Sequence, residues 1–447
     1  MMWRFRPGSS RQATGSSNDR CADANRVPIV TTFEPLLVEP LTMCATSAGR
    51  SLFVILAYLL RALALCIAYL PLTQASGQAP ATTGSTIPQP ADTVGKSWHY
   101  LSEGMQISVE VVAVGVRVPV GIAVLPDGRL LVGDRYTGHL LLVQPGSGVK
   151  KRIEGLTAVF ADTLEAGLLD VVLHPEYRTN GWIYLAYSFD RPGGTTTVVD
   201  RARLSGEKLV DIERLFEATP VVSGSEHYGG RLVLHRGFLF ISLGDRNTRD
   251  QAQYLGDHHG KVIRLRDDGK VPADNPFVGR EDAMPEIWSI GHRNVQGMTV
   301  DAATGALWAN EHGPLGGDEI NIVARGANYG WPMVTQGREY WGALVGKGLT
   351  RREGMVQPLH FWTPRIGPSG LVLYSGDRFP AWRGSAFSGA MAATHLNRLV
   401  FEQGRVVKEE RLFLDRNWRV RQVVQGQDGF LYLGVDGGSL LRVRPRR

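Results

Sequence analysis

GGRLVLHRGFLFISLGDR, residues 229–246, is the stretch that indicates the fold of this chain. A Gly pair opens the segment, an apolar run follows, and a second apolar run comes back after a turn. Alternating apolar runs on both sides of a short turn are typical of a β-hairpin, because successive side chains of a strand point to opposite faces. We therefore expect two antiparallel strands in this segment.

The same unit recurs along the chain, in part degenerate, at residues 121–135, 167–188, 297–313, 370–390 and 420–443. With the first segment this makes six units, and long insertions account for their uneven spacing. A β-sandwich would need fewer residues and would not repeat in this way. The sequence therefore predicts an all-β fold, a six-bladed β-propeller of four-stranded antiparallel blades.

The bulk composition agrees with many turns between short strands, since the 447 residues include 53 Gly and 24 Pro. The formal net charge of +6 is small and scattered, so no nucleic-acid partner is expected. All three cysteines, Cys21, Cys44 and Cys66, precede the predicted propeller. The propeller must therefore be held by packing and hydrogen bonds, without disulfides or thiolate metal sites.

The N-terminal part is typical of targeting rather than of a folded domain. Residues 1–50 are polar and irregular, and we interpret them as an unstructured extension in which Met43 is an alternative start. Residues 51–77 contain a long apolar run followed by small residues, as in a signal peptide or a membrane anchor. Residues 78–100 are expected to be a flexible linker and residues 101–447 the propeller. The protein is thus expected in the periplasm or secreted, with membrane attachment only through such an anchor.

Charged residues cluster among Gly-rich turns in residues 286–332. Arg293, next to Asn294, is a fixed cation whose planar donor fork suits a ligand with carboxylates. Asp318 and Glu319, beside turn carbonyls, are hard oxygen donors of the kind that calcium takes. On these residues alone the alternative, a turn-rich loop with solvated charges, stays equally open.

Two further polar features lie far from this stretch in the sequence. His227 can take up a proton near neutral pH and is a candidate general base, although a lone His is more often structural. Arg419 and Arg421 alternate on a predicted strand, so both guanidinium groups share one face; an exposed basic strand edge is the alternative. Loops at one end of a propeller gather around its axis, so these residues can converge on one pocket.

Together the motifs resemble the soluble quinoprotein aldose sugar dehydrogenases, also called the glucose/sorbosone dehydrogenase family. The resemblance runs from roughly Gly121 to Pro445 and is carried by AGLLDVVLHPEY, HYGGRL, GKVIRLRDDGKVPADNPF, EIWSIGHRNVQGM, NEHGPLGGDEINIVARGANYGWP, PSGLVLY and RVRQV. So many motifs in one order are far more specific than any single motif.

The resemblance implies a propeller that binds pyrroloquinoline quinone and Ca²⁺ at its axis and oxidises aldose sugars at C1 to lactones. It implies that His227 removes the proton of the anomeric hydroxyl while hydride passes to the quinone. Quinone contacts are implied at the positions of Glu165, Arg293, Asn294, Tyr340, Ala390, Arg419 and Arg421. Calcium ligation is implied at Gly313, Pro314 and Asp318 and, in some members, at Glu319 and Tyr329. The three carboxylates of this cofactor suit arginines, and no dinucleotide fingerprint favours NAD or FAD.

Two positions depart from the family pattern. Glu165 stands where members often have Gln, and a carboxylate there would repel a polyanionic cofactor unless it is protonated or paired. Ala392 stands where some members place a Lys, so one positive charge is missing. Both departures bear on the affinity for the cofactor.

The expected partners are an aldose sugar and an external electron acceptor, and the expected state is a monomer or homodimer. One rival function is a calcium-dependent propeller lactonase, which would use the acidic cluster without needing the converging cations. The other is a non-catalytic propeller that binds glycans, in which His227 is structural.

Overall fold

The computed structural model describes residues 92–446 except 157–158 and 163. The three cysteines, the N-terminal extension and the predicted signal peptide or anchor lie outside these residues. None of the helices within the described part has the length and apolar character needed to cross a membrane.

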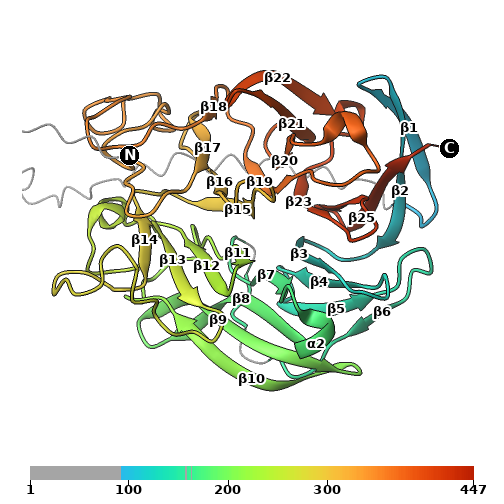
Figure 1. The fold of residues 1–447 in the computed structure, drawn as a ribbon, viewed down its shortest axis with the longest axis horizontal. Coiled ribbons are helices and arrows are strands. Elements are labelled where there is room, and N and C mark those ends of the chain that lie inside the picture. The colour runs from blue at the N-terminus through green and yellow to red at the C-terminus, as the bar shows by residue number, and fades with distance from the viewer. Residues whose placement is uncertain (1–91, 157–158, 163, 447) are drawn as a thin grey trace, which may run out of the picture. The chain divides into compact units, whose positions relative to one another are not determined.

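Six antiparallel sheets stand around a common axis (Figure 1), which confirms the predicted six-bladed β-propeller. The first sheet consists of β3 (Pro119–Val124), β4 (Leu130–Asp134), β5 (His139–Val143) and β6 (Lys150–Arg152), and the second of β7 (Leu168–Leu173), β8 (Trp182–Arg191), β9 (Gly194–Ser205) and β10 (Lys208–Glu217). The third consists of β11 (Leu232–His235), β12 (Phe238–Leu243), β13 (Lys261–Arg266) and β14 (Ile287–Ile290). The fourth consists of β15 (Val295–Val300), β16 (Leu307–Glu311), β17 (Asp318–Ile322) and β18 (His360–Trp362).

The fifth sheet consists of β19 (Pro368–Leu373), β20 (Ala386–Ala390), β21 (His395–Glu402) and β22 (Arg405–Leu412). The sixth contains β23 (Val420–Gln425), β24 (Leu431–Val435), β25 (Ser439–Pro445), β2 (Met105–Val114) and β1 (Ser97–Ser102). This sheet has one strand more than the predicted four, and β1 begins inside the segment assigned to the linker. Helical segments are short: α2 (Tyr177–Asn180) and 3-10 turns at Arg249–Gln253, Pro380–Trp382 and Leu414–Arg416.

Each hairpin unit recognised in the sequence forms the two innermost strands of a blade. The innermost strands contact one another in the order β3, β7, β11, β15, β19, β23 and back to β3, so the ring is closed (Figure 1). Closure brings the loops at each end of six separate hairpins around one axis, which is the geometry that a shared pocket requires.

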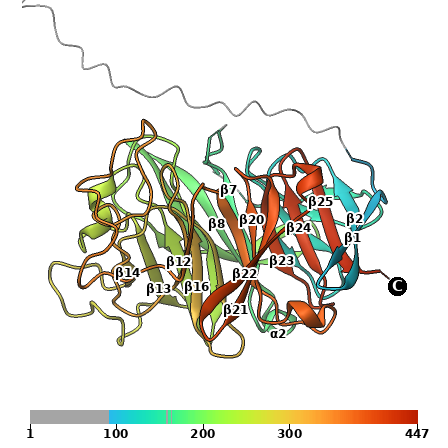
Figure 2. The ribbon, with the colours of Figure 1, turned by 90° about the horizontal axis from the view of Figure 1, so that it is seen from above.

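The first and the last described strands lie in one sheet, which closes the ring (Figure 2). β2 pairs with β25 along the register from Ile107–Pro445 to Val114–Ser439. Buried side chains of both strands, including Val109 and Val443, belong to one apolar cluster. This pairing thus joins parts of the propeller that are distant in the sequence.

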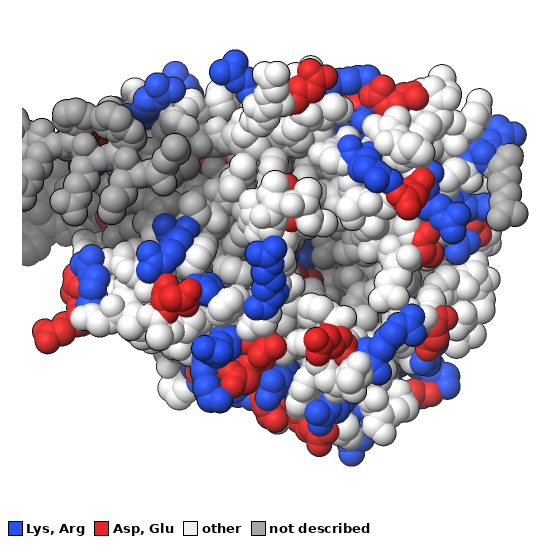
Figure 3. All heavy atoms as spheres, in the orientation of Figure 1, with Lys and Arg blue, Asp and Glu red and all other residues white. Residues whose placement is uncertain are grey.

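Acidic and basic side chains are interspersed on the face drawn in Figure 3, rather than separated by sign. This face is hollowed near its centre, where the innermost strands of Figure 1 meet. The described part of this face therefore carries no extended patch of one charge sign.

Candidate active site

A polar pocket lies on the axis and encloses about 380 Å³ of space free of protein atoms. Every blade supplies part of its wall: Val120, Arg135, Glu165, Leu169, Tyr228, Gly229, Arg231, Gln296, His312, Met391 and Arg421. A second hollow of about 250 Å³ shares His312 and is lined by Gly291, Arg293, Glu311, Gly313, Gly317, Glu319, Tyr329, Trp331, Val334 and Thr335. Six of the predicted residues line these two adjoining spaces: Glu165 and Arg421 line the first, and Arg293, Gly313, Glu319 and Tyr329 line the second. His227 lines neither space and precedes Tyr228, which lines the first.

Three arginines give the axial pocket a positive character. Arg231 is fully engaged by the scaffold, since it donates to the carbonyls of Val120 and Gln296. Arg135 is buried, and this burial lowers its pKa to about 10, with the nearby Arg421 acting in the same direction. Its Nε has no hydrogen-bond partner in the described part of the chain. A buried guanidinium with an unused donor fits an anionic ligand.

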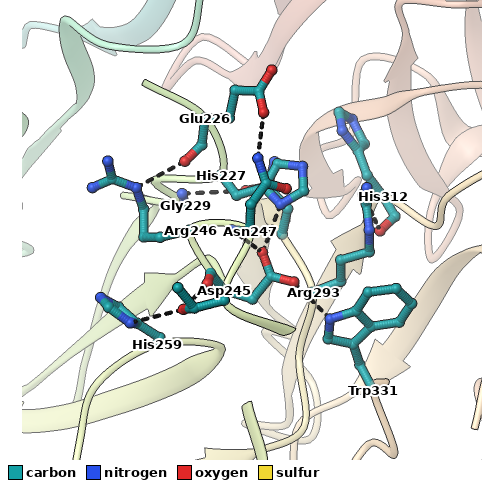
Figure 4. Close-up of polar contacts among 12 residues, drawn as sticks. Glu226, His227, Gly229, Asp245, Arg246, Asn247, His259, Arg293, His312 and Trp331 are labelled. Atoms are coloured by element: carbon teal, nitrogen blue, oxygen red, sulfur yellow. Dashed lines mark hydrogen bonds and ion pairs between the residues drawn. The ribbon is translucent and has the colours of Figure 1, made fainter. Parts of the chain in front are cut away.

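His227 is held with its ring pointing at a carboxylate (Figure 4). Its Nδ1 lies 2.6 Å from Oδ1 of Asp245, whose side chain is completely buried. Burial alone would raise the pKa of Asp245, but hydrogen bonding and the charge of His227 outweigh it and the pKa lies below its ordinary value. An ionised carboxylate can only accept, so the proton of the neutral ring is on Nδ1. Nε2 is then left as the basic atom.

The local backbone that places this pair is strained. His227, Arg246 and Asn247 all have left-handed φ angles, of 54°, 50° and 60°. Gly244, which precedes the carboxylate, packs so closely that a Cβ on it would lie 2.0 Å from the carbonyl oxygen of His227. Three non-Gly residues in this region of φ around one side-chain pair indicate a site whose geometry the fold enforces.

Glu165, the departure from the family pattern, is paired and ionised. Oε2 accepts the backbone N–H of His227 at 2.7 Å and the amide of Asn294 at 3.3 Å. Burial raises the pKa of Glu165, but the neighbouring histidines and the His227 N–H outweigh this, so its pKa lies below the ordinary value. Arg135 lowers it further. The carboxylate that was expected to repel the cofactor is thus partly neutralised by the protein itself.

Arg293 lines the second hollow, and its neighbour Asn294 is buried beside it. Arg293 donates from Nη1 to the carbonyls of His312 and Gly313, at 3.3 and 3.1 Å, while its buried Nε has no partner among the described residues. Its backbone N–H is fixed at 2.7 Å from Glu311 Oε2. Asn294, completely buried, accepts the N–H of Gly229 at 3.3 Å. Arg293 is therefore hydrogen-bonded to the His312–Gly313 segment and Asn294 to Gly229, while the Nε of Arg293 remains available as a donor.

The residues predicted to bind calcium lie close together. Several of their oxygen atoms already take part in hydrogen bonds within the protein. Asp318 accepts the N–H of Gly313 on one oxygen and those of Ile366 and Gly367 on the other. The hydroxyl of Tyr329 donates to the carbonyl of Ile322. Pro314 is buried beside them and its Cγ and Cδ approach Gly337. The side chains of Asp318 and Tyr329 consequently support the corner rather than project freely from it.

Glu319 is an acidic member whose surroundings oppose its negative charge, although the Asn321 amide donates to its Oε2 at 3.4 Å. Burial raises the pKa of Glu319 well above its ordinary value, and the charges of Glu311 and Asp318 raise it further. The adjoining Asn321 has a buried Oδ1 without a partner in the described region. Surplus acceptors and repelling carboxylates fit a bound cation. Across the described residues, no three His, Cys, Asp or Glu side chains are arranged as a metal site by themselves.

Arg419 and Arg421 share one face, as predicted from their alternation. Both guanidinium groups meet the carboxylate of Asp436, at 3.2 Å from Arg419 Nε and 2.9 Å from Arg421 Nε. Arg421 also lines the axial pocket. The exposed-edge alternative does not apply to Arg421, whose side chain is only 11% exposed.

Four predicted cofactor contacts are not among the residues that line the two hollows: Asn294, Tyr340, Ala390 and Arg419. Ala390 is the last residue of β20 and packs in an apolar cluster, while the next residue, Met391, lines the pocket. Tyr340 is 46% exposed on the insertion between β17 and β18, with the Arg365 guanidinium 5.4 Å from its ring.

Four residues that interact with the predicted site were not predicted from the sequence: Arg135, Asp245, Trp331 and Asp436. Asp245 and Arg135 come directly after the second strands of blades three and one, within the repeated letters Gly-Asp-Arg at 244–246 and 133–135. That repetition was the available signal, because a buried Asp-Arg pair at a strand end has no role in strand pairing. Asp436 and Trp331 carried no comparable signal, since Gly-rich turns and buried aromatics are common.

The fold and the site define a six-bladed propeller with an arginine-lined axial pocket and a carboxylate-held histidine beside it. The sequence pattern of the Glucose / Sorbosone dehydrogenase family matches residues 116–442. The chain therefore belongs to the glucose/sorbosone dehydrogenase family.

Relatives agree with this assignment. Aldose sugar dehydrogenase YliI of Escherichia coli is 39% identical over 347 residues, covering 76% of this chain and 93% of that protein. The crystal structure of the soluble aldose sugar dehydrogenase of Escherichia coli in the apo-form superposes with a TM-score of 0.73 at 39% identity, covering 76% of this chain and 100% of that one. The PQQ-bound aldose sugar dehydrogenase of Streptomyces coelicolor, 24% identical, has a TM-score of 0.62 over 79% of this chain and 99% of that one, and shows the fold alone.

Proposed function

We propose that this protein is a quinone-dependent aldose sugar dehydrogenase that oxidises the sugar at C1 to a lactone. The observation that carries the proposal is the His227–Asp245 pair beside the axial pocket with its unused arginine donor. Membership of the family and the names of the relatives point to the same reaction class. A lactonase would use the acidic cluster without needing the converging cations, and in a glycan-binding module His227 would be structural.

The proposed chemistry begins with proton removal by the protein. Asp245 keeps the Nδ1 proton of His227 in place, so Nε2 is free to accept the proton of the anomeric hydroxyl. As the C1–O bond gains double-bond character, the hydrogen on C1 departs with its electron pair. The sugar thus loses one proton to His227 and one hydride to the cofactor, and the lactone results.

The residues present fit the two cofactors in different ways. Arg135, Arg293 and Arg421 would hold the carboxylates of pyrroloquinoline quinone. Glu319 and the carbonyls of Gly313 and Pro314 would hold Ca²⁺. When bound, the quinone supplies the acceptor for the hydride, and the ion stabilises the negative charge that develops on it.

We further propose that the protein works outside the cytoplasm and passes its electrons to an external acceptor. The apolar run at residues 51–72 supports export, and the given sequence contains no Cys-x-x-Cys-His, the attachment signature of a c-type haem that could carry electrons internally.

Reconstitution tests the proposal. Purified protein is supplied with pyrroloquinoline quinone and CaCl₂, and reduction of an artificial dye is followed with a panel of aldoses. We expect sugar-dependent reduction that requires the quinone. Absence of reduction together with hydrolysis of sugar lactones would point to the lactonase, and absence of both activities in folded protein would point to a binding module.

A further inference from the structure

The Asp245 carboxylate has a third partner beyond His227 and the backbone. Its Oδ2 accepts the indole N–H of Trp331 at 2.7 Å, while Oδ1 takes His227 Nδ1 and the N–H of Asn247. The indole comes from the insertion that follows β17, 86 residues further along the chain (Figure 4). One oxygen of the carboxylate is thus assigned to the base and the other to the tryptophan.

We infer that Trp331 is a positioning residue for the reaction: its indole N–H fixes the orientation of Asp245 so that His227 presents an unprotonated Nε2 to the sugar. The inference rests on the proposed function. A fully buried carboxylate needs a donor for each oxygen, and without the indole no described residue would donate a hydrogen bond to Oδ2. The carboxylate would then turn to share His227 and Asn247 between its two oxygens, and the imidazole would follow.

The indole is itself fixed by its main chain rather than by the bond to Asp245. The N–H of Trp331 donates to the carbonyl of Gly291 at 3.0 Å, and its carbonyl accepts the Gln253 amide at 2.7 Å. A phenyl ring at this position would therefore keep its place and lose only the N–H donor. Trp331→Phe is accordingly a selective substitution.

Trp331 also lies against the cofactor side of the site. The guanidinium of Arg293 is 5.3 Å from the centre of the indole ring, within the range of a cation–π contact. Arg249 lies 5.4 Å from the same ring. The Trp331 side chain thus contacts both Asp245 and Arg293, the arginine that would bind the quinone. The positions of these two residues therefore depend on the same indole.

Other tryptophans of this propeller provide a matched control. Trp308 is buried to a similar degree, 8% exposed against 4% for Trp331. Its Nε1 has no hydrogen-bond partner among the described residues. Trp308→Phe therefore removes the same group from the interior without touching a hydrogen bond.

Steady-state kinetics of the reconstituted enzyme test the inference. We expect Trp331→Phe to lower kcat about tenfold, equivalent to about 1.4 kcal/mol, with KM and the quinone Kd within twofold of wild type and Trp308→Phe unchanged. In an Asp245→Asn background, Trp331→Phe should cause no further loss, because its effect passes through Asp245. An unchanged kcat, an equal loss in Trp308→Phe, or a full additional loss in the Asp245→Asn background would overturn it.

A second readout does not depend on turnover. ¹⁵N-histidine NMR of the protein without cofactor reports which ring nitrogen of His227 carries the proton. Wild type should show the proton on Nδ1 only, and Trp331→Phe should show a mixture of both forms. If wild type does not oxidise aldoses, the proposed function fails, whereas an unchanged His227 signal in Trp331→Phe overturns the role of Trp331 by itself.

Discussion

Glu165 accepts the backbone N–H of His227 at 2.7 Å, so the residue that departs from the family pattern directly supports the candidate base. The two are 62 residues apart and come from neighbouring blades. The same Glu165 oxygen receives the amide of Asn294. The carboxylate is therefore a structural element of the site as well as a negative charge within it.

Glu165→Gln should tighten binding of the quinone about tenfold. The substitution removes a negative charge from a pocket lined by Arg135, Arg231 and Arg421, while the amide oxygen can still accept the N–H of His227. Titration of cofactor-free protein with the quinone measures the change in Kd. A Kd equal to or weaker than that of wild type would contradict the expectation.

The same variant should change how stability depends on pH. The pKa of Glu165 lies below its ordinary value of 4.5 in the folded protein. A carboxyl whose pKa falls on folding contributes stability above about pH 4.5, and this contribution is lost as the pH falls through the folded value. Thermal unfolding of cofactor-free wild type and Glu165→Gln should therefore differ at pH 7 and converge in acid. Parallel curves at every pH would exclude this linkage.

His227→Ala should abolish sugar-dependent dye reduction and leave quinone binding largely intact. Removal of the imidazole takes away the only group assigned to the anomeric proton, whereas the cations of the pocket remain. Turnover and quinone Kd are measured on the same preparation. Normal turnover in this variant would show that another residue is the base.

Gly244→Ala should lower kcat at least tenfold because a Cβ there would lie 2.0 Å from the carbonyl oxygen of His227 and push the base away from its place. Gly256→Ala is the matched control, since the nearest atom to its added Cβ is 3.8 Å away and the residue lies outside both hollows. Equal activities of the two variants would show that the close approach at Gly244 does not matter.

Arg398→Ala should lower the free energy of unfolding by about 3–5 kcal/mol. Its side chain is 1% exposed and bridges Glu103, in the turn after β1, to Glu410 of β22. The substitution leaves two carboxylates, in the fifth and sixth sheets, without their shared cation. Arg383→Ala, which breaks an exposed pair with Asp377, should cost no more than about 1 kcal/mol in the same urea titration.

Sequence reasoning reached the fold because each hairpin carries its own signature. The alternation around residues 229–246 and its five relatives is local, and only the count of units is needed to reach the propeller. It could not show that β2, with β1 at its edge, joins the last sheet. Pairing of β2 with β25 joins residues more than three hundred positions apart, which no local pattern encodes.

The amino-acid sequence by itself determined the propeller, the family and the residue types at the site. Only the tertiary structure decided which of those residues are ionised and which still have unused hydrogen-bonding atoms. It bound Asp318 to three backbone N–H groups, paired Glu165 with His227, and set Asp245 and Trp331 behind the base. The physical reason is that the ionisation of a side chain and its unused hydrogen-bonding capacity depend on its neighbours in space, and the closed ring brings those neighbours from different blades.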